Sequence, residues 1–175
     1  MKNKGRTRSL TLSALFAALL AIACPFVIPV GTVGITAATA VLLFAALTAR
    51  PSEAITATAL YLLLGAIGIP VFSHFTGGVG AFLAPSGGFL IGYLPFVTIV
   101  TLVNKRTQNT LILAIATIAA HLVLYLIGCS VFLLTTDRTL PEALAITVLP
   151  FLVPDTLKAA ITLPLSRLTH SRLSR

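Results

Sequence analysis

Two residues of opposite charge stand three positions apart in the last apolar stretch of the chain. Asp155 and Lys158 are the charged residues between Glu142 and Arg167. A spacing of i, i+3 places both side chains on one face of a helix, where they can pair or jointly hold a polar ligand. In a membrane each costs about 2.5–3.5 kcal/mol, and a buried ion pair rarely offsets that cost through stability alone. The pair therefore predicts a polar ligand site, with a structural ion pair as the alternative.

Two prolines and a histidine accompany this pair. Pro150 and Pro154 each lack a backbone donor, and the carbonyls that they free at membrane depth are expected to line a cavity. His121, midway along the preceding apolar stretch, either faces the same cavity or bonds to a nearby carbonyl. The other histidines, His74 and His170, lie in different segments without the spacing of metal ligands, so we expect neither a metal site nor another cofactor.

Transmembrane helices are the elements that must position these residues. Hydrophobic residues make up 57% of the 175 and charged residues 9%, whereas a soluble domain carries about 25% charged residues. Lipid offers no hydrogen-bond partners to backbone N–H and C=O groups, so apolar stretches of about 20 residues form helices there. The sequence predicts an all-α bundle of six transmembrane helices, at residues 10–31, 33–49, 54–70, 88–104, 109–133 and 143–166. Counting about 1.5 Å per residue back from Arg167 puts Asp155 and Lys158 about 18 and 13.5 Å into a core about 30 Å thick.

The stretch 71–87 separates the third and fourth predicted helices. Its glycines, including Gly77 and Gly78, are too frequent for a regular span. It is apolar enough to lie against the helices, which predicts a re-entrant or capping loop on the extracytoplasmic side.

Basic residues predict the orientation. The net charge is +8, but Lys and Arg cluster between the apolar stretches, as topology signals do, and do not form a nucleic-acid surface. Ten of the basic residues fall at the helix ends on one side of the membrane. Basic residues mark the cytoplasmic side, so both termini are expected in the cytoplasm. We expect a basic cytoplasmic segment at 1–9 that leads into an uncleaved first helix, a transmembrane domain at 10–166 and a basic cytoplasmic tail at 167–175.

Small residues recur at helical spacing in the first predicted helix. They are Ala14, Ala17, Ala18 and Ala21. Such a stripe lets another helix approach closely. That helix belongs either to the same chain or to a partner protein.

Sequence motifs of enzymes give no match. The chain lacks the G-x-x-x-x-G-K-[ST] phosphate cradle, so it is not expected to hydrolyse ATP. Ser86 in Ala-Pro-Ser-Gly, with His121 further on, comes close to the pattern of an intramembrane serine hydrolase, but its flanking Pro and Gly residues suit a loop better than a helix-borne nucleophile. We therefore expect a protein that is not an enzyme.

Two longer stretches follow a family pattern. The first is YLLLGAIGIPVF at 61–72, continued by Gly77-Gly78 and by PSGGFLIGY at 85–93; the second is PFLVPDTLK at 150–158. With R-P-x-E-A at 50–54 they resemble the BioY family, the biotin-binding S components of energy-coupling factor (ECF) transporters.

The resemblance implies a biotin-binding uptake subunit in the cytoplasmic membrane of a prokaryote, with a transmembrane coupler and two ATPases as partners. Asp155 would accept from the ureido N–H groups, and Lys158 would pair with it or donate to the ureido oxygen or the valerate carboxylate. The alanine stripe would dock the coupler. The expected substrate-binding residues are Phe72, Phe75, Gly77, Gly78, Ser86, Gly87, Gly88, Phe89, Tyr93, His121, Asp155 and Lys158. A proton-coupled secondary transporter with Asp155 as its proton site, or an intramembrane hydrolase, is the alternative.

Overall fold

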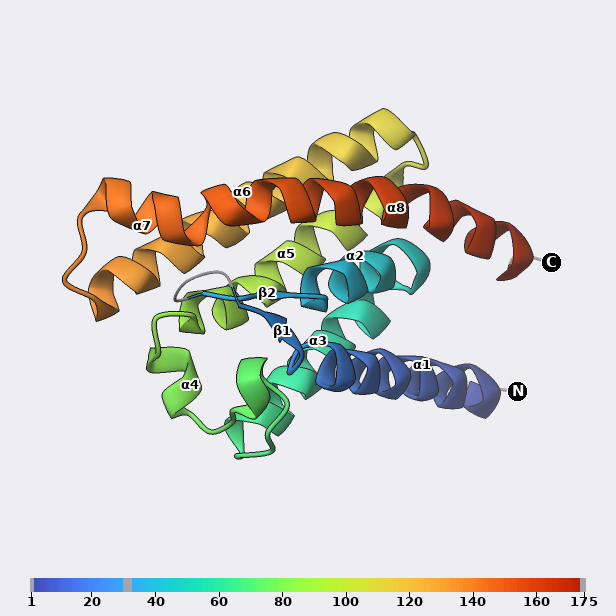
Figure 1. Ribbon diagram of the computed structural model, residues 1–175. Helices are drawn as coiled ribbons and strands as arrows, with labels where there is room; N and C mark the ends of the chain where they lie inside the picture. Colours follow the sequence, from blue (N-terminus) through green and yellow to red (C-terminus); the bar gives the residue numbers. More distant parts are fainter. Residues whose placement is uncertain (1, 30–32, 174–175) are drawn as a thin grey trace.

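Helices make up most of the chain that the computed structural model describes, which is residues 2–29 and 33–173 (Figure 1). The longest helices are α1 (Lys2–Ala23), α5 (Gly87–Arg106), α6 (Thr110–Thr135) and α8 (Leu149–Leu173). The shorter elements are β1 (Val27–Ile28), β2 (Ile35–Thr36), α2 (Ala38–Thr48), α3 (Pro51–Ala66), the 3-10 turn η1 (Ser73–Phe75), α4 (Gly80–Leu83) and α7 (Leu140–Thr147).

Four of the described segments are long and apolar enough to cross a membrane. They are Arg6–Ala23 in α1, all of α5, all of α6, and Leu140–Arg167 across α7 and α8. The expected spans 33–49 and 54–70 form the shorter helices α2 and α3, of 11 and 16 residues. At about 1.5 Å per residue α2 measures about 16 Å, roughly half of the hydrocarbon core. The chain is thus a mostly helical, multi-pass membrane protein.

The first helix ends earlier than the apolar pattern predicts. Pro25 follows it and has no N–H for a helical bond. The chain then turns, and β1 pairs antiparallel with β2, Val27 opposite Thr36. Residues 30 and 31 of the expected span lie outside the described residues. This small hairpin takes up part of the expected second span, so α2 begins only at Ala38.

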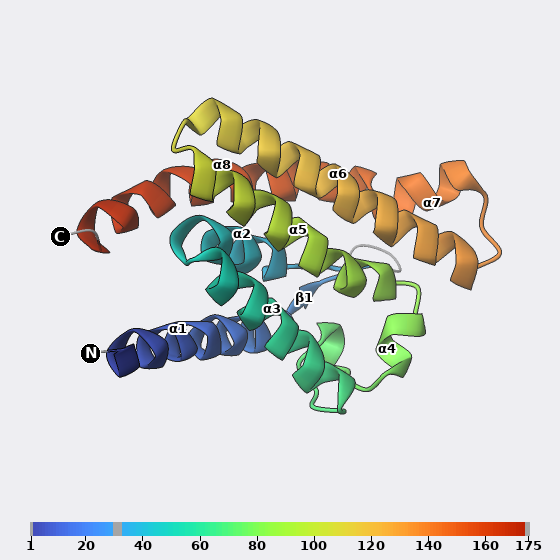
Figure 2. The ribbon, with the colours of Figure 1, turned by 180° about the vertical axis from the view of Figure 1, so that it is seen from behind.

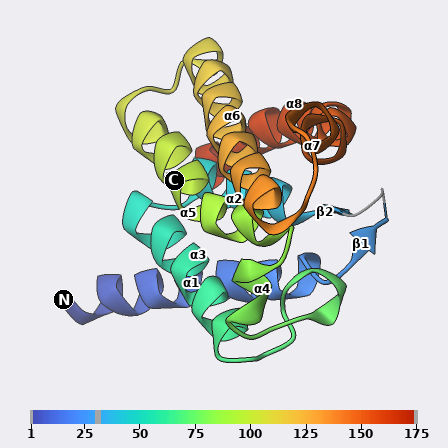
Figure 3. The same cartoon turned by 90° about the vertical axis from the view of Figure 1, so that its left-hand side faces the viewer.

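Helices α2 and α5 occupy the middle of the bundle. Figure 3 shows α6, α7 and α8 on one side of them and α1 and α3 on the other. The closest packing joins α5 and α6, where a Cβ added to Gly88 would lie 2.7 Å from the carbonyl oxygen of Ile127. Small residues allow such close approach of membrane helices. The resulting α5–α6 pair forms a firm wall beside α2 and α8.

The segment 71–87 folds compactly against α3. Phe72 is buried and stacks edge-on against Tyr61 of α3, and Gly78 N–H donates to the carbonyl of Gly65 at 2.7 Å. His74 and Phe75 both have positive φ, near 59° and 56°, which residues with a Cβ rarely adopt. This segment, with α4, lies at one end of the bundle.

The described chain begins and ends at the opposite end of the bundle. Figures 1 and 2 show the start of α1, the α2–α3 and α5–α6 turns and the end of α8 gathered there. Arg50, Lys105 and Arg106 stand at those turns. The segments expected as separate basic ends continue α1 and α8 where they are described, while residues 1, 174 and 175 lie outside the described chain.

The last expected span is broken, but not at the charged pair. Helix α7 ends at Thr147, Val148 leaves the helical conformation, and α8 runs from Leu149 past both Pro154 and Asp155. Pro150 stands in the first turn of α8, where a missing N–H removes no helical bond. The irregular backbone expected at the charges therefore lies about two turns before Asp155.

Candidate functional site

Asp155 is almost completely buried and accepts three hydrogen bonds. Its exposed fraction is 4%. Oδ1 accepts from the Lys158 ammonium at 2.8 Å and from the Thr39 hydroxyl at 3.0 Å, and Oδ2 accepts from the Tyr125 hydroxyl at 2.8 Å. A carboxylate has about four acceptor positions. One position, on Oδ2, is left for a further donor.

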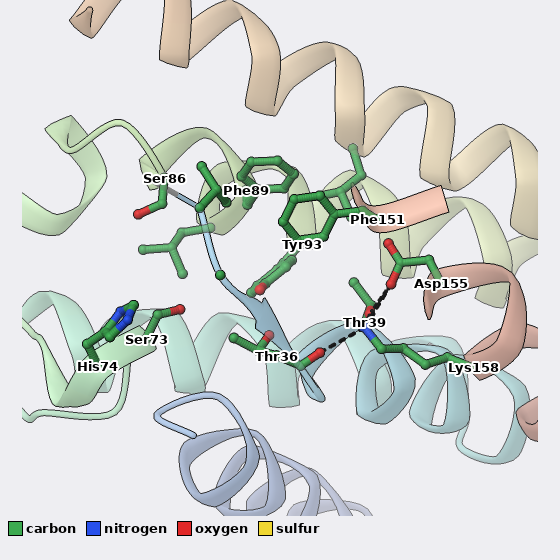
Figure 4. A pocket seen from close by; sticks show the side chains of 14 residues that line it. Thr36, Thr39, Ser73, His74, Ser86, Phe89, Tyr93, Phe151, Asp155 and Lys158 are labelled. Carbon is green, nitrogen blue, oxygen red and sulfur yellow. Dashed lines mark hydrogen bonds and ion pairs between the residues drawn. The ribbon is translucent and has the colours of Figure 1, made fainter. Parts of the chain in front are cut away.

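Lys158 uses all three of its donors within the protein. Besides Asp155 Oδ1, its Nζ donates to the backbone carbonyl of Thr36 at 2.8 Å and to Thr39 Oγ1 at 2.9 Å. The i, i+3 spacing on α8 puts the amine beside the carboxylate, and the β2–α2 junction supplies the other two acceptors. Figure 4 shows this network, with Thr39 between the two charges. The pair thus carries no net charge, and all three donors of Lys158 are hydrogen-bonded.

A pocket lies in front of this network. It takes in about 620 Å³ of space, a figure that includes the part open to solvent. It is lined by Val33, Gly34, Thr36, Thr39, Ser73, His74, Ser86, Phe89, Leu90, Tyr93, Leu124, Phe151, Asp155 and Lys158. We call this the central pocket.

Polar side chains stand at the two ends of the central pocket, and aromatic rings, together with the hydroxyl groups of Tyr93 and Thr36, lie between them. Figure 4 shows Asp155 and Lys158 at one end and Ser73, His74 and Ser86 at the other. The rings of Phe89 from α5 and Phe151 from α8 lie between, 5.7 Å apart and tilted by 30°. This arrangement suits an elongated ligand with an apolar middle and two polar ends.

The structure brings some of the predicted site residues together in the central pocket. Asp155, Lys158, Ser86, Phe89 and Tyr93 line it. Phe72 and Gly77 line a neighbouring hollow that shares Ser73, His74, Ser86 and Leu90 with it.

The other predicted site residues lie elsewhere. Gly87 packs against the backbone of Phe82, and Gly88 lies in the α5–α6 contact. Gly78 holds a turn with φ of 92°, and Phe75 is 59% exposed and meets the ring of Phe26 edge-on.

His121 does not line the central pocket. It lies on α6 behind Asp155, with Nε2 4.0 Å from Oδ2. Its Nδ1 bonds to the carbonyl of Thr117, which agrees with the second of the two expected readings, a contact with a nearby carbonyl.

The predicted alanine stripe is divided between two faces of α1. Ala17 is buried and Ala21 partly buried, on the side where α1 packs against α3 and α2. Ala14 and Ala18 are exposed. Half of the stripe therefore serves packing within the chain.

Several residues of the hydrogen-bond network and of the pocket lining were not among the predicted site residues. Tyr125 stands one helical turn after His121, so the spacing i, i+4 could have placed it on the same face. Thr39 carries no such signal, because it is a small polar residue in an apolar run and reaches Asp155 only through the packing of α2 on α8. Ser73 and His74 depend on the fold of the 71–87 segment, which glycine content alone does not specify.

The fold and the central pocket together define a multi-pass membrane protein whose helical bundle holds a pocket with a hydrogen-bonded charged pair in its wall. The chain belongs to the BioY family, whose model matches residues 1–175.

Individual relatives agree with this assignment. The chain is 35% identical over 154 residues to the biotin transporter BioY2 of Lactococcus lactis subsp. cremoris, covering 87% of this chain and 85% of that one. It is 34% identical over 170 residues to the biotin transporter BioY of Rhodobacter capsulatus, covering 89% of each. Among solved structures, the S-component for biotin from an ECF-type ABC transporter superposes with a TM-score of 0.89 at 25% identity, over 98% of this chain and 95% of the other.

Proposed function

We propose that this chain is the biotin-binding uptake subunit, or S component, of an ECF-type transporter. The observation that carries the proposal is the hydrogen-bonded Asp155–Lys158 pair at one end of the central pocket in a chain of the BioY family. The relatives are named as biotin transporters, and the similar solved structure is an S-component for biotin. The chain itself has no phosphate-binding loop, which fits a subunit that takes its energy from elsewhere.

Biotin fits the central pocket in one orientation better than in the other. Its ureido ring carries N–H donors, and the vacant position on Asp155 Oδ2 accepts such a donor. The donors of Lys158 are already engaged, so a carboxylate at this end would find no free donor on that side chain. The ureido ring is therefore placed at the Asp155 end, the thiophane ring against the Phe89–Phe151 pair, and the valerate carboxylate toward Ser73, His74 and Ser86.

The subunit captures biotin outside and releases it inside. In this proposal the end with Arg50, Lys105 and Arg106 faces the cytoplasm, because basic residues resist translocation. Both termini are then cytoplasmic, and the 71–87 segment covers the pocket from outside as a capping loop. The six apolar stretches remain the proposed spans, with α2 and α3 held inside the bundle by longer neighbours.

The outward half of the alanine stripe is the proposed docking face for a transmembrane coupler, which two ATPases drive. Ala14 and Ala18 are exposed one turn apart on α1, flanked by the exposed side chains of Leu15 and Ile22. Small residues of this kind permit close helix contact in a membrane. Ala17 and Ala21 are excluded from this face because they pack within the chain.

Equilibrium binding of labelled biotin to the purified protein in detergent tests the proposal. Saturable binding is expected in the natural chain and a loss of about 100-fold or more in D155N, because the ureido N–H groups then meet an amide. A matched control is T156V, which changes the neighbouring, exposed residue of α8. Absence of saturable binding, or equal affinity in D155N and the natural chain, would refute the proposal.

A further inference from the structure

His121 has one ring nitrogen bonded and one without a partner. Nδ1 lies 2.9 Å from the carbonyl oxygen of Thr117, an acceptor, so Nδ1 carries the hydrogen. Nε2 of the neutral ring is then an acceptor, and it is buried without a hydrogen-bond partner in the part of the chain that the structure describes. The residue as a whole is 9% exposed. A buried polar atom left in this way requires an explanation.

The unpartnered nitrogen faces the vacant position of Asp155. Nε2 lies 4.0 Å from Oδ2, while Tyr125 occupies only one of the two acceptor positions on that oxygen. In the neutral state two acceptors face each other across this gap. A proton on Nε2 converts the ring into a donor, and a small movement of either side chain then closes a charge-assisted hydrogen bond.

Resting on the proposed function, we propose that a proton on His121 and a ureido N–H of biotin compete for the same position on Asp155 Oδ2. The protonated ring fills the position when the pocket is empty. Bound biotin fills it from the pocket side, and His121 then releases its proton. Binding of biotin and binding of the proton therefore oppose each other, and each weakens the other by the same factor.

The charged and titratable neighbours allow this exchange. Lys158 on α8 is the opposing cation, and it is turned away from His121 toward Thr36 and Thr39, on the Oδ1 side of the carboxylate. Tyr125 on α6 donates to Oδ2, and Tyr93 on α5 also lines the central pocket. Phe96 of α5 holds the imidazole edge-on at 4.8 Å. Histidine is the side chain suited to gaining and losing a proton near neutral pH, and His121 is the histidine beside Oδ2.

The experiment measures the Kd for biotin from pH 5 to pH 8.5, together with the protons released on binding, by calorimetry in buffers of different ionisation enthalpy. In the natural chain we expect Kd to be constant at high pH and to rise as the pH falls, approaching tenfold per pH unit below the midpoint of the transition. Binding at the midpoint should release about half a proton, and about one proton at lower pH. Both effects should vanish in H121F and in H121N.

H170Q provides the matched comparison, because His170 belongs to the expected basic tail at 167–175 and is not among the described residues that line the pocket. A pH dependence that persists in both His121 variants, or one that disappears in H170Q, would overturn the inference. So would pH-independent binding or the absence of proton release in the natural chain, and that measurement needs no variant to fold. If biotin does not bind at any pH, the proposed function fails, and this inference with it.

Discussion

At one end of the central pocket, Asp155 and Lys158 stand on α8 and are bonded to side chains of α2 and α6, so that three helices fix two charges. At the other end, Ser73 and His74 belong to a three-residue turn between helices. The first end has every donor of Lys158 satisfied. The second has positive φ at His74 and Phe75, a conformation that costs about 1–3 kcal/mol for residues with a Cβ.

This difference suggests that the two ends have separate roles, one in recognising the ligand and the other in admitting it to the pocket. A rigid, hydrogen-bonded end holds its polar groups in place before the ligand arrives, and such preorganisation favours tight binding. A strained loop that closes the opposite end can change conformation at low cost. In this view the ligand enters past the 71–87 segment and is recognised at α8.

Breaking the ion pair should have the largest effect. D155N leaves the partly buried Lys158 ammonium without its counter-ion, which destabilises a protein by up to about 3–5 kcal/mol when the charge is fully buried and by less here. The double variant D155N/K158M removes both charges and should recover most of that stability while biotin binding stays lost. Thermal unfolding in detergent and equilibrium binding, measured on the same samples, check the two effects.

A double variant as unstable as D155N would show that the charges are not coupled in the folded state. Biotin binding in the double variant would place recognition outside this end of the pocket and remove the contrast between the two ends.

Removing one donor to the carboxylate should have the next largest effect. Y125F deletes the hydrogen bond to Asp155 Oδ2, and a hydrogen bond to a charged group contributes about 1.5–3 kcal/mol. We expect a comparable loss of stability, because the phenyl ring fills the same space without a donor. The control is Y61F, whose hydroxyl donates to the neutral carbonyl of Val71 at 3.3 Å and should lower stability less. Unfolding curves that give the two variants equal stability would contradict the special rigidity of the Asp155 end.

The same contrast explains which parts of the molecule the sequence predicts. Charges in an apolar run are conspicuous, and their i, i+3 spacing fixes their mutual position, so Asp155 and Lys158 could be placed together from the sequence. Such predictions depend on residues that are rare in a membrane and on short-range geometry.

Predictions that depend on tertiary folding were less successful. An apolar pattern does not distinguish a full span from a short helix preceded by a hairpin, so the first helix was expected to continue beyond Ala23. Thr39 reaches Asp155 only through the packing of α2 against α8, which its sequence neighbours do not indicate. In the 71–87 segment, some residues line a hollow and others point away, because turn conformations with positive φ redirect side chains.

Changes at the far end of the ligand should have a moderate effect. If the valerate carboxylate lies toward Ser73, His74 and Ser86, biotin amide should bind with a loss of about 1 kcal/mol or less, as for an exposed ion pair. A biotin analogue with both ureido nitrogens methylated should lose much more, because the acceptor on Asp155 is left without a donor. Competition against labelled biotin checks both. If biotin amide lost more affinity than the methylated analogue, the ligand would bind in the opposite orientation in the pocket.

Relaxing the strained turn should have the smallest effect on stability. In H74G the residue at φ of 59° has no Cβ, so strain falls, while the unfolded chain gains entropy, and the two changes nearly cancel to within about 1 kcal/mol. The rates of biotin association and dissociation should change together, because the turn moves more freely while the Asp155 end is untouched. Stopped-flow binding measures both rates, and V79G, at an exposed position beyond the turn, is the control. A change confined to the dissociation rate would show that His74 holds the bound ligand and does not control its passage.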